Sequence, residues 1–171
     1  MRKKDTFGRN LWIAVGVYMA VVLLIIISAS LAFSTEQSNI PPRTQILINA
    51  GQAAGAKSIT EGTYNQTIFV EAYMHAHRQA RAGRQSHDGH DARVARLHVL
   101  YPDLRFREIC SQSWAGQNYY EAAYDAFNVS WPSAKGHWEV ANSPCRYYGI
   151  SMARGRNGII YVCMIVAPPK K

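Results

Sequence analysis

An uncharged apolar segment near the N-terminus constrains this chain more than any other feature. Residues Leu11 to Phe33 read LWIAVGVYMAVVLLIIISASLAF and contain no formally charged side chain. A helix rises about 1.5 Å per residue, so this segment would extend roughly 34 Å, slightly more than the roughly 30 Å hydrocarbon core of a bilayer. Trp12 and Tyr18 lie near its first end, and such aromatic residues favour the membrane interface. The segment predicts a transmembrane helix over residues 11–33.

Two other interpretations of this segment fit it less well. Ser30-Leu31-Ala32 has small residues at the positions that a signal peptidase reads. However, the apolar region of a signal peptide usually has about 7 to 15 residues, and this one is longer. A buried core helix that is apolar on all sides would need more protein around it than the rest of a 171-residue chain supplies. An uncleaved membrane anchor is therefore favoured.

The charges that flank the apolar segment predict its orientation. Four basic residues and one acidic residue precede it, whereas the stretch that follows carries Glu36 and no base before Arg43. Basic flanks stay on the cytoplasmic side of a membrane. We therefore expect a cytoplasmic N-terminus over residues 1–10, a linker over 34–43, and a periplasmic or extracellular domain over 44–171. The predicted location is the cell inner or plasma membrane, crossed once.

The charge of the exported part excludes one class of partner. The net charge of the chain is +8, but four of its nineteen bases and one of its eleven acids precede the apolar segment, which leaves a net charge of +5. These bases are scattered along the sequence and are not massed beside aromatic residues. A nucleic-acid-binding protein usually concentrates its bases on one face, so we expect no nucleic-acid partner.

The exported part alternates helical and extended patterns. Apolar residues at helical spacing predict helices over 44–56, over 63–82 with Gly83 as a C-terminal stop, and over 119–127. The stretch from Ser86 to His98 begins as a loop and continues as a short helix, 106–114 reads as a strand, and 128–144 reads as irregular. CRYYGISMA and IIYVCMIVA, joined by RGRNG, predict a hairpin. This order indicates an α/β sandwich with a small antiparallel sheet covered by helices.

The three cysteines lie in the exported part, where disulfides can form: Cys110, Cys145 and Cys163. An odd number leaves at least one thiol unpaired or shared between chains. No CxxC is present, so a zinc ribbon or a redox motif is not indicated. We expect one structural disulfide and one buried thiol, and take Cys110–Cys145 as the pair because Cys110 lies on a strand near the hairpin.

Four segments of the exported part are similar, in order and spacing, to motifs of one family: EAYMHAHRQARAGRQSHDG, WAGQNYYEAAYDAFN, SAKGHWEV and YYGISMARGRNGIIYVCMIV. Together they resemble the CAP superfamily, the SCP-like extracellular domains, over residues 44–167. The resemblance implies a CAP-type α-β-α sandwich. It also implies a cleft with two histidines and two acidic residues, in which some members bind a divalent metal.

The cleft residues carry over only in part. His87 and His137 match the two histidines of the family, whereas Ser111 stands where its strand has a glutamate and Gln112 stands at the next position. Glu108 lies three residues before Ser111, so in a strand it points to the opposite face, and we expect it to be a poor substitute. Two imidazoles without a carboxylate lack a group to orient them or to act as a base. We expect a vestigial cleft with no catalytic residue, cofactor or metal, in which His87 and His137 remain the candidates for metal ligands.

Two functions from different classes remain. The leading hypothesis is a non-catalytic accessory or scaffold subunit of a larger membrane protein complex, with an energy-transducing complex as one option. Its partners would be other membrane proteins and the lipid bilayer. Tyrosine pairs at Tyr119–Tyr120 and Tyr147–Tyr148 are candidates for interface anchors. The alternative is a cell-surface module that binds envelope polymers, or a metal-assisted hydrolase that uses the cleft of His87 and His137.

Overall fold

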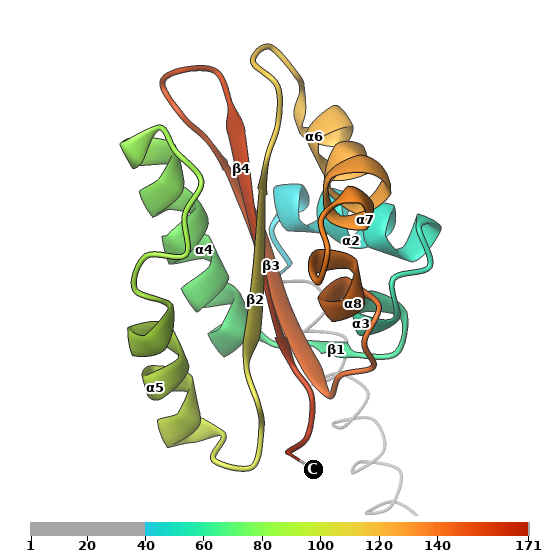
Figure 1. The fold of residues 1–171 in the computed structure, drawn as a ribbon, viewed down its shortest axis with the longest axis vertical. Coiled ribbons are helices and arrows are strands. Elements are labelled where there is room, and N and C mark those ends of the chain that lie inside the picture. The colour runs from blue at the N-terminus through green and yellow to red at the C-terminus, as the bar shows by residue number, and fades with distance from the viewer. Residues whose placement is uncertain (1–39, 171) are drawn as a thin grey trace, which may run out of the picture. The chain divides into compact units, whose positions relative to one another are not determined.

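A computed structural model describes residues 40–170 of the chain, and Figure 1 shows their arrangement. The predicted transmembrane helix from Leu11 to Phe33, the predicted cytoplasmic residues 1–10 and most of the predicted linker lie outside the described residues. None of the helices within residues 40–170 combines the length and the apolar character needed to cross a bilayer.

A four-stranded sheet forms the middle layer of the domain. Its strands are β1 (Thr63–Tyr64), β2 (Arg107–Gln112), β3 (Tyr147–Arg154) and β4 (Ile160–Ala167), in the spatial order β1-β3-β4-β2. The predicted hairpin is confirmed as the antiparallel pair of β3 and β4, and β2 also runs antiparallel to β4. The expectation of a purely antiparallel sheet was wrong, because β1 pairs parallel with β3. Two residues are too short a strand to leave a recognisable pattern in the sequence.

Helices cover both faces of the sheet, which gives three layers (Figure 1). One face carries α4 (Gln66–Ala82), with α5 (His90–Leu100) next to it. The other face carries α2 (Pro42–Ala53), α3 (Lys57–Thr60), α6 (Tyr119–Asp125), the π-helical turn η1 (Ala126–Ser130), α7 (Trp131–Ser133) and α8 (His137–Ala141). The helices predicted over 63–82 and 119–127 are confirmed. The stretch 128–144, which we expected to be irregular, contains η1, α7 and α8.

Helix α4 packs closely on the sheet, and its sequence explains why. The side chain of Asn65 accepts a hydrogen bond from the Ile68 backbone N–H and caps the first turn, while Gly83 ends the helix with φ of 68°. A Cβ atom on Gly149 of β3 would overlap the Phe69 backbone nitrogen, so only glycine permits this approach. The helix face on the sheet is built from small and apolar residues: Ile68, Ala72, Ala76 and Ala80.

The sheet order places β2 at one edge. Side chains along a strand alternate between its two faces, so Glu108 and Cys110 share the face that α4 covers. The loop between α4 and α5, which contains His87, passes over this edge. Polar side chains from α4, α5, β2 and that loop therefore meet at one place.

Candidate functional site

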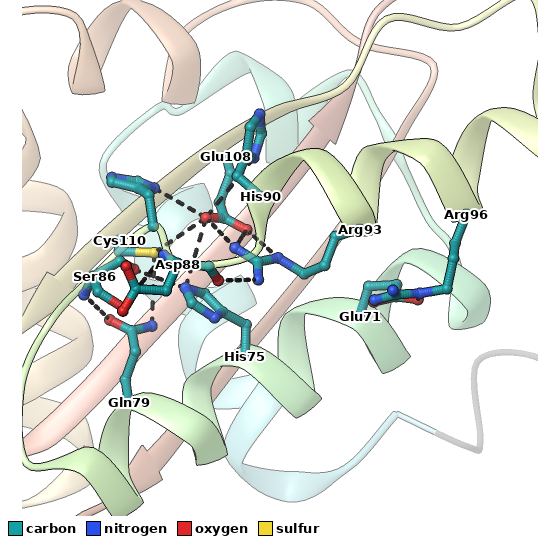
Figure 2. A network of polar contacts seen from close by, with 11 residues as sticks. Glu71, His75, Gln79, Ser86, Asp88, His90, Arg93, Arg96, Glu108 and Cys110 are labelled. Carbon is teal, nitrogen blue, oxygen red and sulfur yellow. Dashed lines mark hydrogen bonds and ion pairs between the residues drawn. The ribbon is translucent and has the colours of Figure 1, made fainter.

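A buried ion pair is the centre of this site. Arg93 of α5 donates from Nε to Oε2 of Glu108 at 2.8 Å and from Nη2 to Oε1 at 2.7 Å. Both side chains are almost completely buried, with 2% and 1% of their surface exposed. Figure 2 shows the two groups facing each other between α5 and β2. Both oxygens of the carboxylate are thus held by one guanidinium, a geometry that orients the pair strongly.

Three histidines lie around Glu108, and the most distant of them is His90, with Nδ1 at 3.9 Å from Oε1. His87 Nδ1 lies 2.9 Å from Glu108 Oε1, and its side chain is about half exposed. His75 Nε2 lies 3.6 Å from the same oxygen, but 2.7 Å from the Ser86 carbonyl oxygen. A carbonyl only accepts hydrogen bonds, so Nε2 of His75 carries a hydrogen. Nδ1 of His75 is buried and has no partner among the described residues.

Cys110 follows Glu108 on the same face of β2 and adds a thiol to the cluster. Its Sγ accepts a hydrogen bond from Gln79 Nε2 at 3.6 Å and lies 3.9 Å from Glu108 Oε1. Its partner in the sheet register is Cys163 of β4, which is fully buried. Figure 2 shows the sulfur between Glu108 and Gln79. Two thiols are therefore paired across the strands next to the buried ion pair.

The charges of this cluster are strongly coupled. Burial opposes ionisation of Glu108, but the hydrogen bond from His87 and the charge of Arg93 outweigh it, so the pKa of Glu108 is lowered. Hydrogen bonds to Cys110 and Glu108 raise the pKa of His87 to about 10. A hydrogen bond with Cys163, aided by the nearby histidines, outweighs burial and lowers the pKa of Cys110 to about 4. These pKa shifts favour the charged forms of Glu108, His87 and Cys110, whose opposite charges lie next to one another in the protein.

The cluster contains three potential metal ligands, but their chemistry does not suit an ion. Ligand atoms of His75, Glu108 and Cys110 lie within 4.8 Å of one another. However, the nitrogen of His75 that faces Glu108 carries a hydrogen, and the Arg93 guanidinium occupies both oxygens of Glu108. Arg93 and the protonated His87 already lie at this carboxylate, so a divalent cation there would be repelled by two positive charges. These three residues hold an ion pair and do not form a built metal site.

The structure brings two of the four predicted cleft residues together and separates the other two from them. The rings of His87 and His137 have centroids 6.3 Å apart, so the two predicted histidines are neighbours. Ser111 is buried and points to the face opposite Glu108, and Gln112 is exposed at the end of β2. The expectation that Glu108 points away from the predicted histidines was wrong, because its Oε1 lies 2.9 Å from His87 Nδ1. The strand alternation was predicted correctly, but His87 lies on the face of Glu108 and not on that of Ser111.

All three cysteines are free thiols, so the predicted Cys110–Cys145 disulfide is not formed. Cys145 Sγ donates to the Ser58 carbonyl oxygen of α3, whereas Cys110 contacts Gln79 of α4. These helices cover opposite faces of the sheet (Figure 1). Sequence spacing alone does not reveal on which face of a sheet a cysteine lies.

Arg93 is the central residue that sequence reasoning missed. It lies four residues before Leu97, and both side chains are buried on the same face of α5. A charged residue at a core position of an amphipathic helix signals a buried partner of opposite charge. Glu108, an acid between the apolar residues Phe106 and Cys110 on one face of the extended run FREICSQ, was the matching signal. Neither signal identifies its partner without the fold.

Comparisons with known proteins inform the fold but not the chemistry. No protein-family model matches this sequence, and no curated protein matches it. Among solved structures, the chain is similar to an outer surface protein from Borrelia burgdorferi, with a TM-score of 0.58 and 14% sequence identity. The alignment covers 77% of this chain and 96% of that chain. At this identity the similarity establishes a shared α/β fold alone.

Proposed function

We propose that this chain is a non-catalytic, membrane-anchored accessory subunit whose exported CAP-like domain binds other membrane proteins. The observation that carries the proposal is the bidentate ion pair in which Arg93 donates to both oxygens of Glu108. A general acid or base must exchange a proton with its substrate, and a carboxylate that is buried and doubly hydrogen-bonded to a guanidinium is a poor one. The carboxylate next to His87 thus serves the fold.

An exposed aromatic surface supports a role in protein binding. Trp114 precedes α6, and Tyr120 and Tyr124 lie on it; their exposed fractions are 77%, 71% and 61%. Tyr120 and Tyr124 also line a shallow hollow of about 790 Å³, together with residues that include Gln117 and Asp125. Tryptophan and tyrosine contribute more than most residues to the binding energy of interfaces. We call Trp114, Tyr120 and Tyr124 the aromatic surface.

The sequence and the fold support the remaining parts of this proposal. The apolar segment from Leu11 to Phe33 would anchor the domain in the inner or plasma membrane, with the domain on the periplasmic or extracellular side. One solved protein with a similar fold is an outer surface protein, which agrees with an exported domain. Helices on both faces of the sheet, and the proximity of His87 and His137, agree with a divergent CAP-type sandwich.

Purification in a mild detergent tests the proposal. We expect the full-length chain to retain stoichiometric membrane partners, and the variant Trp114→Ala/Tyr120→Ala/Tyr124→Ala to lose them while remaining folded. The control is Val99→Ala/Leu100→Ala, which removes exposed apolar side chains from α5 and should retain the partners. A wild-type chain that purifies alone would rule out the accessory subunit. Equal loss in both variants would rule out the aromatic surface.

A metal-assisted hydrolase at His87 and His137 is the second candidate. The contact of His87 Nδ1 with Glu108 favours it, because metal-binding histidines commonly donate their other N–H to a carboxylate. Two imidazoles on one tetrahedral zinc ion have centroids about 5 Å apart. The observed 6.3 Å would have to shorten by roughly 1 Å. Zinc titration of the wild type and of His87→Ala/His137→Ala decides, because equal zinc uptake by both excludes this candidate.

A further inference from the structure

A groove lined by arginines runs between α4 and the turn that joins β3 to β4. Its volume is about 610 Å³. Among the described residues, the side chains that line it include four arginines and one histidine, and none of them is acidic. The lining residues are Tyr73, Met74, His77, Arg78, Ala80, Arg81, Arg154 and Arg156. The arginines come from two segments more than seventy residues apart, so only the folded domain collects them.

These four arginines differ from others in the domain. Arg84, Arg93, Arg96 and Arg146 each form an ion pair with a carboxylate, at distances between 2.7 and 3.5 Å. Within residues 40–170, none of the arginines of the groove has such a partner. Arg154 donates to the carbonyl oxygens of Gly158 and Gln117, which holds its guanidinium in place but does not neutralise it. The groove therefore concentrates unbalanced positive charge.

The groove also has an aromatic wall. The rings of Tyr73 and His77 lie one turn apart on α4, with centroids 4.0 Å apart. Tyr73 and Met74 are both nearly half exposed. The ring surfaces of this wall suit the organic part of a ligand.

The positive charges of the groove arginines repel one another, and an anion bound in the groove would offset that repulsion.

We propose that this arginine groove binds a phosphate-bearing ligand, such as a phospholipid headgroup or a soluble phosphate compound. Guanidinium groups present paired N–H donors that match the oxygens of a phosphate, and several can bind one group at once. A carboxylate would satisfy one arginine, whereas a phosphate has enough acceptor atoms for two or more. This inference does not depend on the accessory-subunit proposal, because the groove and the aromatic surface share no residue.

Binding measurements on the full-length chain in a neutral detergent test the inference. Inorganic pyrophosphate serves as the soluble probe. Dihexanoylphosphatidylglycerol serves as the lipid probe, with dihexanoylphosphatidylcholine as the zwitterionic control. The variant is Arg81→Gln/Arg156→Gln, and the matched control is Arg105→Gln/Arg107→Gln, which removes the same charge outside the groove. We expect affinity to fall about tenfold in the first variant and by less than about twofold in the second.

The outcomes separate the two sources of phosphate. Binding of both phosphate probes supports a general phosphate site, and binding of the phosphatidylglycerol probe alone assigns the site to lipid headgroups. In both cases the affinity should decrease as salt increases, because the contacts are ionic and partly exposed. The inference is overturned if neither pyrophosphate nor the phosphatidylglycerol probe binds. It is also overturned if the groove variant and its control lose the same affinity. Circular dichroism of both variants verifies that they remain folded.

Discussion

Two groups of polar side chains lie on different sides of α4 and use arginine in opposite ways. In the buried cluster, Arg93 is sealed against Glu108, and α4 contributes His75 and Gln79. In the arginine groove, α4 contributes Arg78 and other exposed residues, and within residues 40–170 none of the four guanidiniums is paired with a carboxylate. A buried charge that is paired with an opposite charge stabilises the fold. A surface charge that has no such partner can bind a ligand.

The energetics of the two groups should differ as much as their chemistry. Removing an ion from water costs several kcal/mol, and only a partner with good geometry offsets that cost. Arg93 and Glu108 meet this condition through two hydrogen bonds, of 2.8 and 2.7 Å. Arg78, Arg81 and Arg156 of the groove are exposed and keep their hydration, so substituting one of them should change stability little. Three measurements test this contrast.

The largest expected effect follows from removing Arg93. Arg93→Met leaves the Glu108 carboxylate buried without its partner, and we expect the free energy of unfolding to fall by about 3–5 kcal/mol. The double variant Arg93→Met/Glu108→Met removes both charges and should recover most of that loss. Denaturant unfolding of the full-length chain at constant detergent measures both changes.

A matched control for this prediction exists on the same helix. Arg96 of α5 pairs with Glu71 in a bidentate geometry, but its own side chain is half exposed. We expect Arg96→Met to cost less than about 1 kcal/mol, as is usual for exposed pairs. If Arg93→Met and Arg96→Met cost the same, burial does not distinguish the cluster from the surface.

The second prediction concerns the two thiols at the bottom of the cluster. The Ser113 N–H donates to the Ile160 carbonyl oxygen, and the Arg105 N–H donates to the Pro168 carbonyl oxygen. Both pairs continue the register of β2 and β4, in which hydrogen-bonded and non-hydrogen-bonded pairs alternate. Cys110 and Cys163 therefore face each other at a non-hydrogen-bonded position, where Cα atoms lie about 4.5 Å apart. This separation is within the range that a disulfide spans.

We expect oxidised glutathione to cross-link Cys110 and Cys163 when the domain opens in a moderate concentration of denaturant. One thiolate would attack glutathione disulfide and release one glutathione thiolate, and the second cysteine would then displace the other. Peptide mapping should find this cross-link, and the disulfide should stabilise the fold by about 2–4 kcal/mol. Cys145→Ser should give the same product and Cys163→Ser none. A peptide that links Cys110 to Cys145 would contradict the observed register.

The smallest predicted effect is a dependence of stability on pH. Contacts with Cys110 and Glu108 raise the pKa of His87 from 6.5 to about 10. Protonated His87 thus stabilises the folded chain fully below pH 6.5, and this contribution is lost as the pH rises towards 10. Cys110 acts in the opposite sense, because its lowered pKa adds stability that is lost as pH falls from 9 to about 4.

The histidine contribution is therefore measured in Cys110→Ser, where Glu108 still raises the pKa of His87. In this protein we expect the free energy of unfolding to decrease as pH rises above about 6.5. Adding His87→Gln should flatten the profile in that range. An unchanged slope in the double variant would mean that His87 is not coupled to Glu108 in this pH range.

Local patterns of the sequence predicted much of the fold correctly. Helix α4 shows apolar residues at helical spacing before Gly83, and the β3–β4 hairpin shows two β-prone runs around RGRNG. Such elements are visible because their causes lie within a few residues of one another. Strand β1 was not visible, since its two residues are extended only because β3 pairs with them.

The sequence by itself determined the apolar segment from Leu11 to Phe33 and the main helices and strands, whereas the proximity of His87 and His137 was implied only by the resemblance to the CAP superfamily. Only the tertiary structure decided that Glu108 faces His87, that Arg93 neutralises Glu108, and that four arginines share one groove. Periodicity reports the face of an element on which a side chain lies. It does not report what packs against that face, and for a charged group the neighbour decides between structure and function.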